Sequence, residues 1–301
     1  MTYFLLAIFI GVSLVINQAA ISLILGICFS IINNRYSLTS VKVDGTSFLK
    51  AGIILLGGTI SLGSVSEISL NYLPLVSLYV LMIFLVGFLL GRVLKVEKKH
   101  LILLVAGTAI CGGTAIASLA PVIKAKTEEL VSSISLVFLL NLLAIILFPL
   151  IGQYLGMSEK DFGIFAALTI HDTASVLGTA SIYGEESVVY ASVIKLGRTL
   201  WIIPMILSFS LYFKNKDAEY DFPYFIIFFL VFVLLGTFID LNQDILIMIK
   251  KISSALFLLG LFFIGAQFNL KTLNELTIKP VIFAITLWLI IIITTLLIFY
   301  V

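Results

Sequence analysis

The sequence predicts an all-α integral membrane protein of about eleven transmembrane helices, two of them discontinuous within the membrane. Three observations predict this class. Of the 301 residues, 61% are apolar and only 11% are charged, and the mean hydropathy is +1.22, outside the range of soluble globular domains. The apolar residues form long runs, and about 20 such residues span a bilayer. Two of these runs are rich in Gly, Ala, Ser and Thr.

The apolar runs give the expected spans in chain order. They cover residues 2–16, 18–33, 47–63, 72–95, 99–121, 128–154, 160–181, 186–213, 221–240, 247–268 and 279–301. They leave no room for a soluble domain, so we expect one polytopic domain over residues 1–301. The first run has no basic region or small-residue cleavage site before it ends, which favours a retained helix over a signal peptide.

The distribution of Lys and Arg between the junctions predicts the orientation. With the N-terminus in the cytoplasm, twelve basic residues fall on the cytoplasmic side and four on the other, which favours a cytoplasmic N-terminus and an external C-terminus. The twelve are Arg35, Lys42, Lys50, Arg92, Lys95, Lys98, Lys99, Lys160, Lys214, Lys216, Lys271 and Lys279, and the four are Lys124, Lys126, Lys250 and Lys251. Lys124 and Lys126 are a local exception to the rule.

Two distant segments resemble each other and predict an inverted-topology repeat. ILLGGTISLGSVSEI, from Ile54, aligns with FFIGAQFNLKTLNEL, from Phe262, and in an eleven-helix count the two cross in opposite directions. Such repeats are typical of secondary transporters, although chance similarity of Leu/Gly-rich segments is the alternative. The alignment pairs Gly57 with Gly265, Leu62 with Leu270 and Glu67 with Glu275.

The span 99–121 contains the sequence AGTAICGGTAIA at residues 106–117. Glycines and small hydroxyl residues weaken a continuous helix at mid-membrane. A break near Gly112 and Gly113 would start a half-helix inside the membrane, with free N–H groups and a positive dipole end suited to an anion. The alternative is an unbroken helix whose small residues permit close packing.

The span 160–181 carries His171 and Asp172 near its middle. Ionisable groups at that depth are costly and mark functional paths. Asp172 could bind Na⁺ or a proton, and His171 could donate to a substrate or relay a proton. A re-entrant or surface loop is the alternative for this segment. We expect no metal site, because further ligands are lacking and His100 lies at a span boundary.

Lys195 and Arg198 lie three residues apart within the span 186–213, so they project from one helix face. Two cations in the membrane require a water-filled cavity, an anion or the Asp172 carboxylate nearby. A purely structural ion pair with Asp172 is the alternative. Even that pairing leaves one positive charge over, which favours an anionic substrate.

Three motifs in this order resemble the YeiH-type family of bacterial membrane proteins, described as sulfate exporters. They are CGGTAIASLAPVIKAKTEE from Cys111, TIHDTASVLGTASIYG from Thr169 and VIKLGRTLWIIP from Val193, and the likeness covers essentially the whole chain. The resemblance implies a multi-pass protein of the bacterial inner (cytoplasmic) membrane. The matching motif positions imply a central site, and a wider resemblance to transporters with two crossed broken helices is an analogy of architecture only. That site would comprise Cys111, Gly112, Gly113, Thr114, His171, Asp172, Thr173, Lys195 and Arg198.

The leading functional hypothesis is a secondary active transporter, an exporter of a small anion such as sulfate or an organosulfonate. We expect alternating access with H⁺ or Na⁺ coupled through His171 and Asp172, and no other cofactor. A passive anion channel is the alternative. A membrane enzyme is disfavoured, because Cys111 and His171 lack a third catalytic partner. The dispersed net charge of +2 argues against nucleic acid as a partner, and a homodimer is left open.

Overall fold

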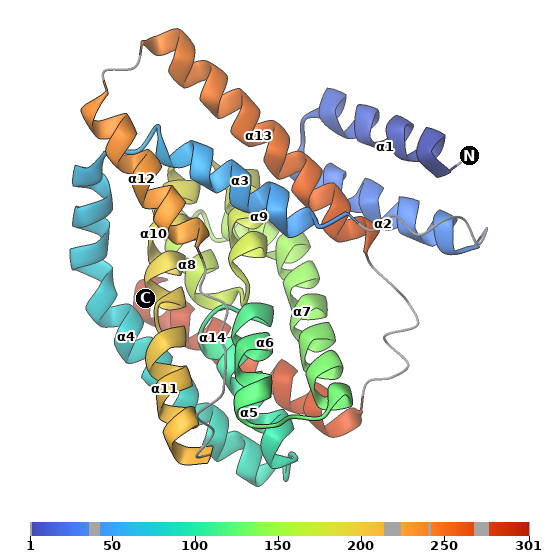
Figure 1. Ribbon diagram of the computed structural model, residues 1–301, viewed down its shortest axis with the longest axis vertical. Helices are drawn as coiled ribbons and strands as arrows, with labels where there is room; N and C mark the ends of the chain where they lie inside the picture. The colour runs from blue at the N-terminus through green and yellow to red at the C-terminus, as the bar shows by residue number, and fades with distance from the viewer. Residues whose placement is uncertain (1, 36–42, 214–223, 240–241, 268–276, 301) are drawn as a thin grey trace.

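The computed structural model describes residues 2–35, 43–213, 224–239, 242–267 and 277–300 (Figure 1). Fourteen α-helices occupy these ranges, and no strand occurs in them. The helices are α1 Thr2–Ile16, α2 Ala19–Arg35, α3 Gly45–Gly57, α4 Leu62–Val93, α5 Lys98–Ala109, α6 Gly113–Val122, α7 Thr127–Tyr154, α8 Glu159–Thr169, α9 Thr173–Tyr183, α10 Glu185–Thr199, α11 Ile202–Phe213, α12 Phe225–Phe238, α13 Gln243–Ala266 and α14 Ile278–Tyr300.

The helices form two groups. In the first, α13 packs between α2 and α3, with α1 against α2 and α12 against α3. The second contains α4 to α11 and α14, and Figure 1 shows α4 along its left edge and α7 along its right. Helix α9 joins the groups, because it contacts α2, α3 and α13 as well as α7 and α10.

The first group is held by close backbone packing along α13. Gly260 approaches Gly45 of α3, where an added Cβ on Gly45 would come within 2.6 Å of the Gly260 carbonyl. Buried hydroxyls add polar contacts: Ser253 Oγ donates to the Gly52 carbonyl at 2.8 Å, and Ser22 Oγ to the Leu258 carbonyl at 2.7 Å. Small residues and interhelical hydrogen bonds are the usual means of helix association in lipid.

The predicted span 99–121 is discontinuous, as expected, but it does not cross the molecule. Helices α5 and α6 pack against each other as a hairpin. Lys99, at the start of α5, donates from Nζ to the carbonyl of Lys124, just beyond the end of α6, at 2.5 Å. The segment therefore enters and returns on one side of the molecule. Residues 98–122 are called the first hairpin below.

The predicted span 160–181 is likewise a re-entrant hairpin, formed by α8 and α9. Tyr183, at the end of α9, donates from its hydroxyl to the Met157 carbonyl at 2.7 Å, and its ring stacks on Phe162 at 3.9 Å. The Glu186 N–H donates to Glu159 Oε2 at 2.9 Å. The start of α8 and the end of α9 therefore lie together. Residues 159–183 are called the second hairpin below.

The two hairpins enter from opposite ends of the molecule. Helix α7 connects the base of the first hairpin to the base of the second through short turns. Its 28 residues span about 40 Å at 1.5 Å per residue, close to the thickness of a bilayer. The two hairpins are therefore inverted relative to each other.

The prediction that residues 99–121 and 160–181 cross the membrane is therefore wrong. Each half-helix is only 10 to 12 residues long, so it reaches mid-membrane and turns back. The crossed broken helices expected by analogy are replaced by opposed hairpins. Five described segments are long and apolar enough to span a bilayer: α4, α7, α10 with α11, α13 and α14.

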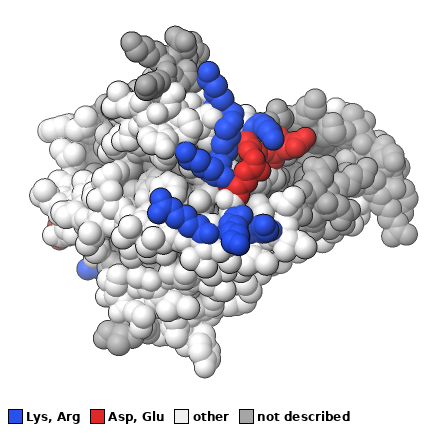
Figure 2. Space-filling model, turned by 90° about the horizontal axis from the view of Figure 1, so that it is seen from below, with Lys and Arg blue, Asp and Glu red and all other residues white. Residues whose placement is uncertain are grey.

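Re-entrance also moves three lysines between the two faces. Lys124 and Lys126 join the basic residues at the end of α4 and are no longer an exception to the predicted distribution, whereas Lys160 moves to the opposite end. Figure 2 shows Lys and Arg side chains gathered on this end of the molecule. We call it the basic face and define it by Arg92, Lys95, Lys98, Lys99, Lys124 and Lys126.

Two of the other differences from the expected spans have a local explanation. Helix α4 begins at Leu62, ten residues before the predicted start at residue 72, because Ser61 caps it by accepting a hydrogen bond from the Ser64 N–H at 3.2 Å. The expected span 186–213 is divided between Thr199 and Ile202. Pro204 lacks the N–H that would continue the helix there.

The predicted sequence repeat stays a prediction. Gly57 and Gly265 lie near the ends of α3 and α13, which pack antiparallel. The other aligned positions of the second copy, Leu270 and Glu275, lie outside the described residues.

Thiol labelling tests the re-entrant topology. In a variant whose natural cysteines are replaced by alanine, we expect Lys99→Cys and Lys124→Cys to react with a membrane-impermeant maleimide from the same side. Lys160→Cys should react from the other side, because its hairpin enters from the opposite end. The measurement is labelling in right-side-out and inverted vesicles. Labelling of Lys99→Cys and Lys124→Cys from opposite sides would contradict the first hairpin.

Candidate functional site

The tips of the two hairpins meet inside the molecule. A Cβ added to Gly112, at the tip of the first hairpin, would lie 2.9 Å from Cβ and 3.1 Å from the backbone nitrogen of Asp172, at the tip of the second. Only a residue without a side chain permits this approach. The motifs that the sequence places 60 residues apart therefore form one centre.

Gly112 also makes the turn of the first hairpin. Its φ of 65° and ψ of −126° belong to a region that L-residues with a Cβ avoid. The Gly112 N–H donates to the Gly107 carbonyl at 2.8 Å, which closes the end of α5. The glycine that weakens the helix in the sequence is thus the residue that reverses the chain.

Asp172 makes the turn of the second hairpin by capping α9. Its Oδ1 accepts hydrogen bonds from the N–H groups of Ala174 at 2.8 Å and Ser175 at 3.1 Å. Its Oδ2 accepts from Asn141 Nδ2 at 2.7 Å and from the Ser175 hydroxyl. Four donors directed at one carboxylate suit its ionised form, and the negative charge complements the positive end of α9.

Arg198, on α10, binds the C-terminal ends of both first half-helices. Its Nε donates to the Ala109 carbonyl at 2.7 Å and a terminal nitrogen to the Thr108 carbonyl, both in α5. The other terminal nitrogen donates to the α8 carbonyls of Ala167 at 3.0 Å and Leu168 at 2.7 Å. These carbonyls lack helical partners. Arg198, 1% exposed, therefore joins the two hairpins.

Lys195 lies one helical turn before Arg198 and binds the second hairpin. Its Nζ donates to the carbonyl of Ile170, the C-cap residue of α8, at 2.8 Å. The side chain is fully buried. The predicted shared face of Lys195 and Arg198 is confirmed, and both cations face the negative ends of half-helices.

Asn141, on α7, links the tip residues and was not identified from the sequence. Its Oδ1 accepts from the His171 N–H at 3.0 Å and lies 3.1 Å from His171 Nδ1, while its Nδ2 donates to Asp172. The His171 ring is buried and its Nε2 has no partner among the described residues. The sequence signal that could have identified Asn141 is its place as a single amide inside an apolar run, since amides in membrane helices form hydrogen bonds with neighbouring helices.

Trp288 of α14 supports the second hairpin and was also missed. Its Nε1 donates to the Thr169 carbonyl at 2.9 Å. Its ring stacks on Phe148 at 5.5 Å and lies 6.2 Å from the His171 ring. The tryptophan is one of two in the chain, and in an apolar helix its N–H required a buried acceptor.

The start of α6 is the accessible part of the centre. No side chain of the described residues caps this helix. A Cβ on Gly113 would meet nothing within 4 Å, Thr114 is exposed, and Thr173 at the start of α9 is partly exposed. Cys111, by contrast, is buried. The residues beside open space are therefore Gly113, Thr114 and Thr173.

The charges buried at the tips give a positive centre. Lys195 and Arg198 are accompanied by one carboxylate, that of Asp172, with which the described part of the chain shows no salt bridge, and the half-charges of the four helix ends cancel. With a neutral His171, the net charge is about +1. The surplus charge inferred from the sequence persists, but the alternative of an ion pair with Asp172 is wrong for the described residues, because both cations bind backbone carbonyls at the C-terminal ends of α5 and α8.

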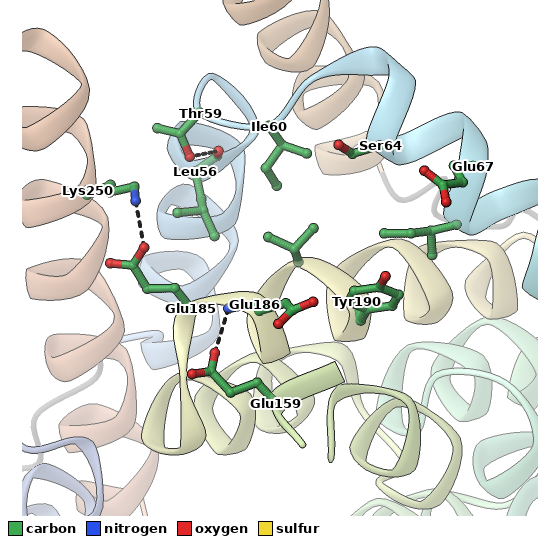
Figure 3. Close-up of a pocket in the computed structure, with 12 residues that line it drawn as sticks. Leu56, Thr59, Ile60, Ser64, Glu67, Glu159, Glu185, Glu186, Tyr190 and Lys250 are labelled. Atoms are coloured by element: carbon green, nitrogen blue, oxygen red, sulfur yellow. Dashed lines mark hydrogen bonds and ion pairs between the residues drawn. The ribbon is translucent and has the colours of Figure 1, made fainter. Parts of the chain in front are cut away.

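An acidic cavity of about 560 Å³ lies at the end of the molecule from which the second hairpin enters. Figure 3 shows Glu67 beside it on α4, Glu185 and Glu186 on α10, and Glu159 at the base of the second hairpin. Lys250 of α13 forms an ion pair with Glu185 at 2.6 Å. The two ends of the molecule therefore differ in charge, since the opposite end is the basic face.

Replacement of Arg198 should destabilise the protein. Arg198→Met leaves four buried carbonyls without this donor, and loss of one partner of a buried charged network costs about 3–5 kcal/mol. Lys195→Met removes one hydrogen bond and should cost less. The measurement is the melting temperature in detergent, with the order wild type, Lys195→Met, Arg198→Met. A wild-type melting temperature for Arg198→Met would refute the joining role.

The neighbouring glycines offer a matched pair. Gly112→Ala should lower the free energy of unfolding by about 3 kcal/mol, because the alanine is strained at this φ and its Cβ meets Asp172. Gly113→Ala should leave it unchanged or raise it by about 0.5–1 kcal/mol, since the position is helical and open. Thermal unfolding of both variants in one detergent measures the difference. Equal stabilities would contradict the tip contact.

Comparisons with known proteins agree with the sequence motifs. Residues 2–284 match the family described as "Conserved hypothetical protein 698". A UPF0324 membrane protein of Bacteroides thetaiotaomicron is 35% identical over 92% of this chain and 84% of its own length. One of Shewanella oneidensis is 37% identical over 82% of this chain and 78% of its own. No solved structure matches. The chain thus belongs to the UPF0324 family of membrane proteins, which is the YeiH family.

Proposed function

We propose that the protein is a secondary active transporter that exports a small anion, such as sulfate or an organosulfonate, across the bacterial inner membrane. The observation that carries this proposal is the meeting of two opposed hairpins beside the uncapped start of α6. Discontinuous helices at the midplane are the usual binding element of secondary transporters, because their half-helix ends supply polar backbone inside the membrane.

The hairpin arrangement suits alternating access. Each hairpin is anchored at one face and reaches the centre only with its tip, so displacement of one tip would open the centre to one side. In this scheme each hairpin is a gate, and the hydrogen bonds from Arg198 to both α5 and α8 link the two. A binding centre closed between two gates is the minimum that alternating access requires.

The accessible groups are matched to an oxyanion. The N–H groups at the start of α6 and the hydroxyls of Thr114 and Thr173 are donors, and sulfate and sulfonate oxygens accept hydrogen bonds from such donors. In this proposal Lys195 and Arg198 act indirectly, without contact with the anion. They hold the half-helices and supply the positive field, while Gly113, Thr114 and Thr173 contact the anion and Cys111 and Gly112 shape the turn.

Of the two expected coupling groups, His171 is the one we propose to carry the proton, and Asp172 positions it. The buried Nε2 of His171 lacks a partner among the described residues, which favours a proton over Na⁺ as the coupling ion. Asp172, already accepting four hydrogen bonds, would hold its position through Asn141. Protonation of His171 would add a positive charge at the centre and so strengthen anion binding.

The charge difference between the faces supports export. The basic face is cytoplasmic by the positive-inside rule, so it concentrates anions beside the first hairpin. The carboxylates around the opposite cavity repel anions and disfavour loading from outside.

Transport of radiolabelled sulfate into proteoliposomes tests the proposal. Thr114→Val should raise the KM about tenfold or more, because a hydrogen bond to a charged ligand contributes about 1.5–3 kcal/mol. Thr277→Val, at the exposed residue that precedes α14, is the matched control and should transport as wild type. Unchanged KM in Thr114→Val would remove the proposed site, and sulfate flux that no ion gradient can concentrate would identify a passive channel.

The same assay tests coupling. His171→Gln, which cannot be protonated, should abolish the response of sulfate uptake to an imposed pH gradient while leaving counterflow of preloaded sulfate measurable. Asp172→Asn should instead weaken folding, since the cap of α9 is lost. A pH response retained by His171→Gln would exclude His171 as the coupling group.

A further inference from the structure

A groove of about 580 Å³ opens between the last turns of α4, the first turns of α5 and the end of α11. Its floor is apolar: Val96, Leu101 and Ile102 are buried there, and Phe88 and Phe209 are half-buried along its walls. The groove lies at the basic face, next to the base of the first hairpin, and it is separate from the tip centre.

The mouth of the groove carries two cations. Arg92 and Lys98 are exposed lining residues, and neither forms a salt bridge with any carboxylate of the described residues. Lys98 Nζ lies 3.3 Å from the hydroxyl of Tyr212 and 5.1 Å from its ring centroid. These contacts hold the ammonium over the groove, while its charge stays without an anionic partner.

The walls of the groove continue into apolar surface. On α4, Leu85, Leu89 and Val93 are 53–76% exposed, and on α11 Leu207 and Leu211 are 60% and 81% exposed. Exposed leucines at this density in membrane-spanning helices face lipid tails. The groove thus opens towards the bilayer, and its cations lie at helix ends, which is the depth of lipid head groups.

We propose that this groove binds an anionic phospholipid of the cytoplasmic leaflet. Its phosphate would contact Arg92 and Lys98, and one acyl chain would lie on Phe88, Leu101 and Phe209. The combination of unpaired cations with an apolar channel selects this ligand class. A free phosphate or sulfate would leave the apolar floor bare, and the ammonium of a zwitterionic lipid would be repelled by the neighbouring lysines of the basic face.

Bound there, the lipid would fill the space between α4 and α11 and brace the base of the first hairpin. A ligand that binds the folded protein raises its stability in proportion to affinity and concentration. The groove and the tip centre share no residue, so lipid binding in the groove is independent of the transported substrate.

Native mass spectrometry of the full chain in detergent tests the site with phosphatidylglycerol as the probe. Phosphatidylcholine of the same chain length is the reference lipid, and glycerol phosphate represents the head group alone. We expect phosphatidylglycerol to bind about 25-fold more tightly than phosphatidylcholine and to raise the melting temperature, since each of the two basic residues contributes about fivefold in affinity for anionic lipid. Glycerol phosphate should do neither.

Paired variants locate the binding. Arg92→Gln with Lys98→Gln should reduce phosphatidylglycerol binding to the level of phosphatidylcholine. Lys95→Gln with Lys124→Gln removes the same charge from the basic face outside the groove and should retain binding within about twofold. Equal loss in both double variants, no preference for phosphatidylglycerol, or an equal effect of glycerol phosphate would each overturn the proposal. Size-exclusion elution and sulfate flux of the variants verify that the fold is intact.

Discussion

The whole centre depends on the hydrogen bonds between Arg198 and the carbonyl groups at the ends of α5 and α8. Helices that stop inside a membrane leave carbonyls that lipid cannot satisfy, and each such group costs several kcal/mol. A guanidinium has five donors in a fixed plane, and four bonds from Arg198 are made to these ends. One side chain thus makes two broken helices tolerable at once.

The same interaction makes a buried cation tolerable. An arginine at mid-membrane would be very unfavourable alone, and here the negative C-terminal ends of two half-helices accept hydrogen bonds from Arg198 and Lys195. Asn141 then ties His171 and Asp172 to α7, the helix that spans the distance between the hairpin bases. The N-terminal end of α6 has no side-chain cap among the described residues, and it is this end that the proposed function assigns to the anion.

Several features of the site were predictable because they follow from residue type alone. Gly112 and Gly113 indicate a break in a membrane segment, and a carboxylate beside a histidine indicates a polar centre. Asn141 and Trp288 escaped notice because a single amide or indole in an apolar run has many uses in a membrane helix. Their partners, Asp172 and Thr169, lie on other elements, and pattern along one helix carries no information about them.

By itself, the sequence determined that the chain is a helical protein of the lipid bilayer. It also determined the positions of the two breaks and the types of residue placed at them. These follow from local rules: apolar length, glycine conformation and the cost of charge in lipid. Only the tertiary structure decided that the broken segments turn back, since a half-helix of about ten residues can continue across or return with equal local energy. That choice depends on where its free carbonyls find donors, and Arg198, far along the chain, supplies them.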